Sequence, residues 1–480
     1  MEILNWASIS LGIFLSLTTA GHALLNQRIP SSALGWVAVC LIFPFAGPVL
    51  YFLFGINRVK TRALKLGDKR QAAKIGLSDT GGDATRLATV SCAGLNLPRS
   101  YVQVARISDT VSNFPMVAGN RIEPLHNGEA AYPAMLNAID NASRSVYLTS
   151  YIFDTSGTGK KFIDALGRAT DRGVDVRVII DGFGELYSFT RASKLLKKKG
   201  VQVTRFLPPR LLLPPIHINL RNHRKILTVD GHTGFTGGMN IGDRHLAENI
   251  RNPSRSIDMH FRLSGPVVMQ LEQTFIEDWA FCTGEQIDPT RSLPVKSGTA
   301  VCRVISDGPD EDMNNLSTIL IGAISSARER ILIMTPYFLP SPEMISALQT
   351  AALRGVRVNV VLPFKNNLPY IKWAGTNMLP DLLFRGVHIF YQPPPFVHTK
   401  LFVMDEQYAQ IGSANLDPRS LRLNFELTVE IYDRNVATQL AAHIEEQLRK
   451  STPVTLESVR NRPFIIKMRD AVVWLFSSYL

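Results

Sequence analysis

The sequence predicts an α/β protein in which two similar α-β-α units, related by a pseudo-twofold axis, follow an N-terminal transmembrane helical hairpin. Three observations lead to this class. The body of the chain repeats itself once, two long N-terminal runs carry no formal charge, and hydrophobic residues make up 45% of the chain against 19% charged residues. This composition excludes a disordered, collagen-like or acidic-tail protein.

The N-terminal runs Ile3–Leu25 and Ala33–Phe54 contain no Asp, Glu, Lys or Arg. About 20 apolar residues in a helix cross a hydrocarbon core of about 30 Å. The short link between the runs holds Pro30, so a tight two-helix hairpin is expected over residues 1–57. Pro44 and Pro48 interrupt the second run. The alternative is therefore a shallow or re-entrant second helix.

Basic residues dominate the segment after the hairpin. Seven bases between Arg58 and Lys74 face one acid, Asp68, whereas the link between the runs holds the single base Arg28. The positive-inside rule then places the large C-terminal part in the cytoplasm. The whole chain has a formal net charge of +12, which favours phosphates as partners, on lipid or on nucleic acid. The four cysteines form no CxxC pair, so a disulfide framework and a cysteine-based zinc site are not expected.

The repeat is visible in four pairs of segments. NRIEPLHNGEAAYPAMLNAIDNASRSVYLTSYIF pairs with CRVISDGPDEDMNNLSTILIGAISSARERILIMTPYF, RGVDVRVIID with RGVRVNVVLP, KGVQVTRF with RGVHIFYQ, and HRKILTVD with HTKLFVMD. The predicted divisions are the hairpin at 1–57, a basic linker and lead-in at 58–110, a first unit at 111–295, a second unit at 296–450 and a tail at 451–480. A duplicated unit of this kind predicts one fold built twice.

Each copy is expected to run helix, strand, helix, strand, helix, strand, turn, strand. VYLTSYIF and ILIMTPYF are rich in β-branched and aromatic residues, as strands prefer. KKFIDALGRATDRG and EMISALQTAALRG space their apolar residues as amphipathic helices and end at glycine. VDVRVIID and VRVNVVLP are nearly continuous apolar strands, a pattern typical of strands buried on both faces.

A motif that occurs once in each repeat indicates a catalytic site. His223, Lys225 and Asp230 form H-x-K-x4-D, and His398, Lys400 and Asp405 form it again. Strand alternation puts histidine and lysine on one face. There, histidine can act as acid, base or nucleophile on a phosphate and lysine as a fixed positive charge. The aspartate has the opposite parity, so structural support near the strand end is its expected role.

Polar residues after each motif also repeat. Asn240 follows the first motif, and Ser413 and Asn415 follow the second. We expect them to donate hydrogen bonds to phosphate oxygens, with ordinary β-turns as the alternative. Asp258 and Glu426 lie in strand-like stretches. They are expected to orient the catalytic histidines through the far ring nitrogen, with cross-strand ion pairs to arginines as the alternative.

The paired motifs HRKILTVD and HTKLFVMD resemble those of the phospholipase D superfamily, and the chain resembles bacterial cardiolipin synthases over nearly its whole length. SYIFD, GGMNIGD, TPYFLP, GSANLDPRS and the hairpin carry the resemblance. Family members often have an aromatic residue near the stretch that reads RSIDMH here, so Asp258 matches less closely than Glu426.

The resemblance implies two phospholipase D-like units that share one active site and work without a metal or other cofactor. A phosphatidyl group passes from one phosphatidylglycerol to another through a phosphatidyl-histidine, giving cardiolipin and glycerol. The two H-x-K-x4-D motifs form the catalytic set, and related enzymes suggest His223 as the nucleophile and His398 as the acid and base. The expected partners are phosphatidylglycerol and anionic membrane lipids, without nucleic acid, at the cytoplasmic side of a bacterial inner membrane crossed more than once.

Some questions stay open at this stage. A phospholipase D that uses water as acceptor and a membrane-anchored nuclease are the alternative functions. The proline-rich stretch FLPPRLLLPPIHINLRNHRK either dips into the bilayer surface or packs on the protein's own core. The C-terminal stretch FIIKMRDAVVWLFSSYL is expected to form a terminal core helix, with an interfacial membrane contact as the alternative.

Overall fold

The structure is a computed structural model that describes residues 2–27, 30–55, 99–209, 220–290, 295–309 and 314–477. The chain divides into an N-terminal unit, Met1–Lys65, and a body, Leu66–Leu480. The basic segment from Arg58 to Lys74 and the middle half of the proline-rich stretch, residues 210–219, lie outside the described residues. The predictions made for them stay predictions.

The N-terminal unit begins with one long helix, α1 (Glu2–Asn26). Its segment Trp6–Asn26 is long and apolar enough to cross a membrane. The second apolar run is broken into α2 (Pro30–Ile42), α3 (Ala46–Leu50) and a π-helical turn, η1 (Tyr51–Gly55). The interruption contains Pro44, which has no N–H to donate and disfavours helix in the residue before it. The second run is therefore not one continuous spanning helix.

Side chains of α1 hold it against the second run. The hydroxyl of Ser16 donates to the carbonyl of Cys40 over 2.8 Å, and Nδ1 of His22 lies 2.8 Å from the hydroxyl of Tyr51. Burial of Ala23, Cys40 and Tyr51 completes a small core. Most other apolar side chains described in this unit, such as Phe14 and Leu25, are exposed, as expected for helices whose outer surface contacts lipid.

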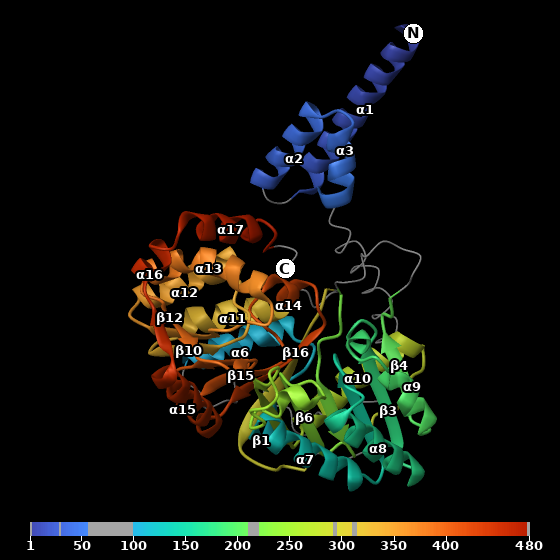
Figure 1. Cartoon of the computed structure of the whole chain (residues 1–480). Coiled ribbons are helices and arrows are strands. Elements are labelled where there is room, and N and C mark those ends of the chain that lie inside the picture. Colours follow the sequence, from blue (N-terminus) through green and yellow to red (C-terminus); the bar gives the residue numbers. More distant parts are fainter. Residues whose placement is uncertain are drawn as a thin grey trace. The chain divides into compact units, whose positions relative to one another are not determined.

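The body contains a 15-stranded sheet in the order β17-β12-β11-β10-β14-β15-β16-β9-β1-β8-β6-β5-β2-β3-β4. From β12 to β4 this order is symmetric about the antiparallel pair β9–β1, so the two predicted units form halves of one sheet (Figure 1). The strands are β1 (Val117–His126), β2 (Ser145–Ser150), β3 (Asp175–Asp181), β4 (Gln202–Phe206), β5 (Ile226–Val229), β6 (Thr233–Gly237), β8 (Met259–Ser264), β9 (Ala300–Asp307), β10 (Arg330–Met334), β11 (Arg357–Pro363), β12 (His388–Gln392), β14 (Leu401–Met404), β15 (Tyr408–Gly412), β16 (Glu426–Tyr432) and β17 (Thr452–Val454).

Each half follows the predicted order of elements. Strands β2, β3 and β4 are parallel, as are β10, β11 and β12, while β5 and β14 join antiparallel to β2 and β10. Parallel strands need crossovers, and in each half helices supply them. The helices of the two halves are α7 (Asn127–Asp140), α8 (Gly157–Asp171), α9 (Ala192–Lys198), α10 (Val267–Thr283), α11 (Asn315–Ser326), α12 (Pro342–Leu353), α13 (Pro369–Phe384), α14 (Pro418–Arg422) and α15 (Arg434–Lys450).

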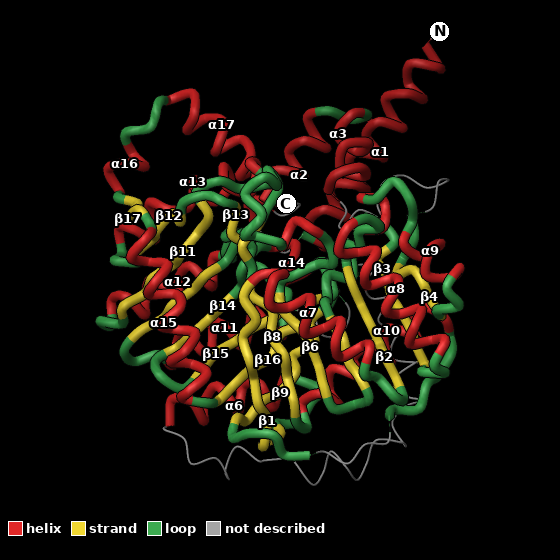
Figure 2. Tube along the Cα trace, turned by 60° about the horizontal axis from the view of Figure 1, so that its bottom comes forward, coloured by secondary structure: helices red, strands yellow, loops and turns green. Residues whose placement is uncertain are grey.

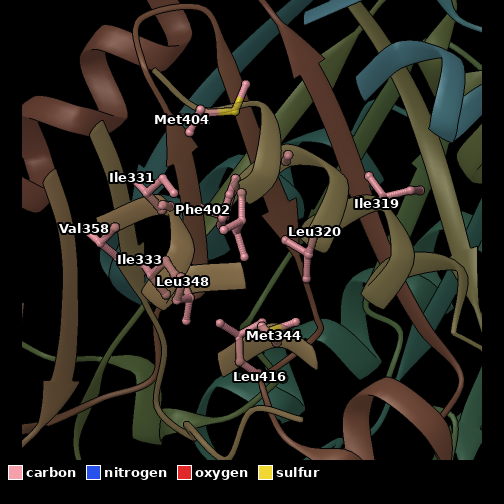
Figure 3. Packing of buried hydrophobic residues seen from close by; sticks show 14 of the residues in the cluster. Ile319, Leu320, Ile331, Ile333, Met344, Leu348, Val358, Phe402, Met404 and Leu416 are labelled. Atoms are coloured by element: carbon pink, nitrogen blue, oxygen red, sulfur yellow. The ribbon is translucent and has the colours of Figure 1, made fainter. Parts of the chain in front are cut away.

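Large apolar clusters hold the helices to the sheet. Figure 3 shows part of the cluster in the second half, where Ile319 and Leu320 of α11 and Met344 and Leu348 of α12 lie among residues of β10 and β14. The strands contribute apolar side chains to both faces of the sheet, because successive residues such as Ile331 and Leu332 belong to different clusters. This explains why the central strands are apolar without alternation.

The flanking segments belong to the second half. Helix α6 (Arg99–Val111), which precedes the first repeat, buries Tyr101, Val104 and Ala105 in the cluster of the second half. At the other end, β17 pairs with β12, and α16 (Leu456–Arg460) and α17 (Phe464–Trp474) follow it. Helix α17 buries one residue, the charged Asp470. The expectation that the C-terminal stretch forms a core helix was therefore wrong.

Candidate active site

The two H-x-K segments lie where the halves of the body exchange backbone hydrogen bonds. The N–H of His223 donates to the carbonyl of Phe425 over 2.9 Å, and the N–H of Phe425 donates to the carbonyl of Arg221 over 2.8 Å. On the other side, β13 (Phe396–Val397) pairs with β7 (Ser256–Ile257), and the N–H of His398 donates to the carbonyl of Ile257 over 2.7 Å. Each histidine is thus held by the repeat to which it does not belong.

These exchanges bring a carboxylate to each imidazole. Nδ1 of His223 lies 3.1 Å from a carboxylate oxygen of Glu426, and Nδ1 of His398 lies 2.8 Å from a carboxylate oxygen of Asp258. Both carboxylates are fully buried. Such a pair keeps the proton on Nδ1, leaves Nε2 for chemistry and stabilises an imidazolium when it forms.

Buried ion pairs fix the segment around His223. The N–H of Asn222 donates to the carboxylate of Asp181 over 2.9 Å. The guanidinium of Arg224 bonds the carboxylate of Asp278 over 2.6 Å and the backbone carbonyl of Glu426 over 3.0 Å. Arg224 and Asp278 have almost no exposed surface. Because a buried ion is costly without its partner, this network restrains the segment to one geometry.

The two lysines lie beside the imidazoles. Nζ of Lys225 donates to the carbonyl of His223 over 2.5 Å. Nζ of Lys400 donates to the carbonyl of His398 over 2.7 Å and lies 3.1 Å from Nε2 of that ring. Burial lowers the pKa of Lys225 to about 7 and that of Lys400 to about 8. A bound anion would raise both pKa values again, so the ligand-free site is suited to a negatively charged group.

The basic groups of the two repeats influence one another. Burial lowers the pKa of both imidazoles, and the charges of Lys225 and Lys400 lower the pKa of each ring further. The carboxylate of Glu426 acts in the opposite direction on His223. Together with the crossed contacts of His223 with Glu426 and of His398 with Asp258, this mutual influence groups the four basic side chains in one site.

The two motif aspartates lie at the far ends of β5 and β14. The carboxylate of Asp230 accepts from the N–H groups of residues 143, 144 and 145 over 2.7–2.9 Å. That of Asp405 accepts from the N–H groups of residues 328, 329 and 330 over 2.9–3.1 Å. Both aspartates have positive φ, at 54° and 52°, in the left-handed region that Asp tolerates better than most residues. The structure does not bring them to the imidazoles, so their place in the predicted catalytic set is corrected to a structural one.

Of the residues expected to bind phosphate, Ser413 and Asn415 donate to the protein, whereas Asn240 contacts it through its acceptor oxygen. Oδ1 of Asn240 accepts from the N–H of Ile152 over 3.2 Å, and Nδ2 of Asn415 donates to the hydroxyl of Ser420 over 3.1 Å. The hydroxyl of Ser413 donates to the carboxylate of Glu426. A hydroxyl has one proton to donate, so Ser413 positions Glu426 here and does not offer that proton to a phosphate.

A glycine occupies the position of Ser413 in the first repeat. A Cβ atom on Gly238 would lie 2.6 Å from Oδ1 of Asp258. Any side chain at this position would displace the carboxylate that contacts His398. The two halves therefore hold their carboxylates differently. The hydroxyl of Ser413 donates to Glu426, whereas Gly238 has no side chain to contact Asp258.

Three residues near the histidines were not assigned a role from the sequence. His245 is buried, and its ring centroid lies 6.0 Å from that of His398. The ring of Tyr151 lies 5.1 Å from that of His223, with Nζ of Lys225 5.7 Å from its centre. The ring of Tyr337 lies 6.5 Å from that of His398. The two tyrosines occupy equivalent places in the repeat, just after β2 and β10. This repetition in the sequence could have identified them.

The hydrogen bonds of His245 define its tautomer. Its Nε2 lies 3.2 Å from the backbone N–H of Asn240 and must accept there. The proton is then on Nδ1, which lies 3.4 Å from the hydroxyl of Ser256 and 3.8 Å from the carboxylate of Asp258. Burial holds the pKa of His245 well below its usual value, so the ring is neutral at neutral pH.

Metal ligands do not cluster in the described part of the chain. No group of three or more His, Cys, Asp or Glu side chains there could hold a metal ion. The expectation of a reaction without metal or cofactor stays a prediction, because the chemistry must be measured to decide it.

Comparisons with known proteins match both the body and the N-terminal unit of the chain. A family profile described as "Cardiolipin synthase, PLD-like domain" matches residues 135–279 and 320–448, and one described as "Phospholipase_D-nuclease N-terminal" matches residues 14–55. The first covers both halves of the body and more than half of the chain. The second covers most of the N-terminal unit, which together with the apolar helix α1 indicates association with a membrane.

Curated relatives match over nearly their whole length. The major cardiolipin synthase of Bacillus subtilis is 30% identical over 484 residues, 98% of each chain. Cardiolipin synthase A of Pseudomonas putida is 31% identical over 97% of this chain and 96% of its own. Among solved structures, a phosphatidylserine synthase from Haemophilus influenzae matches with a TM-score of 0.60 at 16% identity, covering 78% of this chain and 100% of its own. This last likeness supports the fold.

Proposed function

The chain belongs to the cardiolipin synthase family with phospholipase D-like domains, and on that premise we propose that it is a cardiolipin synthase. It transfers a phosphatidyl group from one phosphatidylglycerol to another and releases glycerol. The observation that carries this proposal is the pair of crossed contacts, His223 with Glu426 and His398 with Asp258. They supply two oriented imidazoles to one site with two buried lysines, which is what a two-step transfer at phosphorus needs.

In the first step, Nε2 of His223 attacks the phosphorus of phosphatidylglycerol. Binding of the phosphodiester anion raises the pKa of His398, so the ring takes up a proton from solvent. A nitrogen–phosphorus bond then forms, the bond to the headgroup oxygen breaks, and the protonated ring of His398 gives its Nε2 proton to the departing glycerol. Glu426 stabilises the positive charge that His223 acquires. Lys225 and Lys400 offset the charge of the nonbridging oxygens, as cationic groups do in phosphoryl transfer.

In the second step, the neutral ring of His398 removes a proton from a headgroup hydroxyl of a second phosphatidylglycerol. That oxygen attacks phosphorus, the nitrogen–phosphorus bond breaks, and cardiolipin leaves with both histidines restored. Asp258 stabilises the imidazolium of His398 in both steps. We assign the nucleophile to His223 from the resemblance to related enzymes, because the geometry of the two imidazoles is nearly symmetric.

The proposed location is a bacterial inner membrane, with the body on the cytoplasmic side. The match of residues 14–55 to a family N-terminal profile and the span Trp6–Asn26 support the membrane. The basic residues after the hairpin support the cytoplasmic side. Crossing by both apolar runs is part of the proposal, and reaction of single engineered cysteines with an impermeant label in intact and opened cells would test it.

The proposed reaction can be tested with the purified full-length chain in mixed micelles of phosphatidylglycerol and detergent with a chelator. Cardiolipin and glycerol should appear in equal amounts. Phosphatidic acid as the main product would instead show a hydrolase, and loss of activity with the chelator would refute the metal-free route. His223→Gln and His398→Gln should each abolish transfer, whereas His388→Gln, at an exposed position on β12, should not.

The nucleophile can be identified by trapping. A phosphorus-labelled phosphatidyl ester of p-nitrophenol, whose leaving group needs no proton, should leave acid-labile label on the His398→Gln protein, because only breakdown of the intermediate then needs that ring. The His223→Gln protein should carry none. The opposite pattern would exchange the two roles without changing the reaction.

A further inference from the structure

The C-terminal helix α17 presents an apolar face to solvent. Phe464, Ile465 and Leu475 are 75%, 74% and 70% exposed. Exposed apolar residues scattered singly over a surface are normal, whereas a contiguous patch marks a binding surface. Seven exposed apolar side chains lie between the start of α17 and the turn that follows it. Apart from Trp474 they are Phe464, Ile465, Met468, Val472, Leu475 and Phe476.

Helical spacing gathers these six residues on one side. At about 100° per residue they fall within an arc of about 120°. Two exposed bases, Lys467 and Arg469, lie at the two flanks of this arc. We call the six residues the α17 apolar face. An apolar face flanked by lysine and arginine is the pattern of a helix that lies in the plane of a membrane surface.

Buried charges fix the orientation of α17. The carboxylate of Asp470 is 1% exposed and pairs with the guanidinium groups of Arg462 and Arg469. The guanidinium of Arg469 also lies 4.2 Å from the ring centre of Trp373 in α13. Rotating the helix to bury its apolar face would expose Asp470 and break these contacts. The apolar face therefore points outward because the opposite side of the helix is held.

The helix lies at the edge of the body that carries the active site. Trp373 belongs to the first turns of α13, which starts just after the carboxyl end of β11. The residue after that strand end, Phe364, is exposed and its carbonyl accepts from Nζ of Lys372. Figure 2 shows α17, α13 and β13 at this same edge, and β13 leads directly into His398. In the other half, the η3 turn (Gly184–Tyr187) follows β3, and Tyr187 and Phe189 are exposed at this equivalent strand end.

We propose that the α17 apolar face docks on the bilayer and thereby presents the active-site edge to lipid. The occupant is the headgroup boundary of a membrane that contains anionic lipid, because bases flank the face and the chain carries its own membrane-associated N-terminal unit. The inference rests on the proposed function in one respect, that the site must receive two lipid molecules from a bilayer. It assigns to α17 a part in substrate access that is separate from the chemistry.

Docking can be measured without turnover. The full-length Ile465→Cys protein, labelled with an environment-sensitive fluorophore and reconstituted in vesicles of phosphatidylglycerol and phosphatidylcholine, should be quenched at least threefold more by brominated lipid than a Leu353→Cys control. Leu353 is 66% exposed and ends α12, a helix that runs back toward the opposite edge of the sheet. The parent chain labelled in parallel gives the background from native cysteines. Equal quenching at both positions would overturn the proposal.

The effect on activity gives the second readout. Ile465→Ser with Leu475→Ser should raise the KM for phosphatidylglycerol in vesicles about fivefold or more. Activity on a short-chain, monomeric phosphatidylglycerol and the melting temperature should stay unchanged, since both side chains are exposed. Equal loss on both substrates would show a structural role and overturn the proposal. A fluorescence change at residue 465 that depends on protein concentration and not on lipid would overturn it as well. Quenching without cardiolipin synthesis would leave docking intact and refute the proposed function instead.

Discussion

Nδ1 of His223 lies 3.1 Å from the carboxylate of Glu426, although 203 residues separate the two in the chain. The reciprocal contact joins His398 to Asp258 over 140 residues. Each half of the body thus supplies the carboxylate that orients the histidine of the other half. Neither half holds both a motif histidine and the carboxylate that orients it, which gives a physical reason for the two repeats to share one continuous sheet.

Glu426→Gln should lower kcat by about 100-fold or more, because an amide still accepts from Nδ1 but no longer stabilises the imidazolium. The KM for phosphatidylglycerol should change little, since Glu426 is fully buried behind the ring. Steady-state kinetics in mixed micelles would measure both constants. Glu406→Gln, at an exposed ion pair with Arg434, is the matched control. A Glu426→Gln protein with kcat close to that of the parent would remove Glu426 from the mechanism.

The pH dependence of kcat/KM should report the two lysines. Burial lowers the pKa of Lys225 to about 7 and of Lys400 to about 8, so the free protein loses positive charge as the pH rises through this range. We therefore expect kcat/KM to begin to fall at about pH 7 and to fall more steeply above about pH 8. In the complex, the phosphodiester raises both pKa values, so kcat should hold to higher pH.

Lys400→Arg offers a check on this assignment. A guanidinium stays charged throughout the range, so the alkaline fall of kcat/KM should then reflect Lys225 alone and become less steep, whatever the absolute activity of the variant. A parent profile that stays flat from pH 6 to pH 9 would show that the lysines do not titrate in this way.

Asp230→Ala should reduce stability and leave the chemistry nearly intact. Burial acts to raise the pKa of Asp230, but hydrogen bonds from the N–H groups of residues 143–145 outweigh it and lower the pKa overall. The contribution to stability is therefore full above the unfolded-state pKa and is lost as the pH falls through the lower, folded-state value. We expect a loss of about 1–2 kcal/mol at pH 7, allowing for screening of a partly exposed group.

Thermal melting at several pH values would measure this loss. The difference between Asp230→Ala and the parent should shrink below about pH 4, and Asp171→Ala, at an exposed position at the end of α8, should show no difference at any pH. If Asp230→Ala lost kcat without losing stability, the aspartate would return to the catalytic set.

The sequence predicted the repeated elements well because each is encoded locally. Strand composition, amphipathic spacing and the glycine after each helix determine them without distant contacts. It could not predict which histidine each carboxylate serves, because that depends on the parallel pairing of β13 with β7 and of Asn222 with Phe425. The sequence also could not show that the hydroxyl of Ser413, expected to donate to phosphate, donates to Glu426. That contact forms only when β15 and β16 pair.

The C-terminal helix shows a different limit. Its composition is apolar enough for a core helix, and the prediction followed from that composition. The outcome depends on Asp470, whose pairing with Arg462 and Arg469 turns the charged side of α17 inward. An ion pair between a helix and the segment before it has no periodic signature in the sequence, so composition alone pointed to the wrong side.

His245 gives the final prediction, because it contacts the carboxylate region behind His398 without being placed to touch substrate. Its protonated Nδ1 lies 3.8 Å from Asp258 and its Nε2 accepts from the N–H of Asn240 over 3.2 Å. His245→Leu removes both interactions and should lower kcat about tenfold with little change in KM, because a less firmly held Asp258 orients His398 less well. His245→Gln, whose amide can both accept and donate, should recover much of this loss.

His443→Leu, at a half-buried imidazole on α15, controls for the loss of a histidine elsewhere. The kinetic constants and the acid limb of the pH profile would be measured for all three proteins. Equal losses in the leucine and glutamine variants, with a matching drop in melting temperature, would show that His245 serves packing alone.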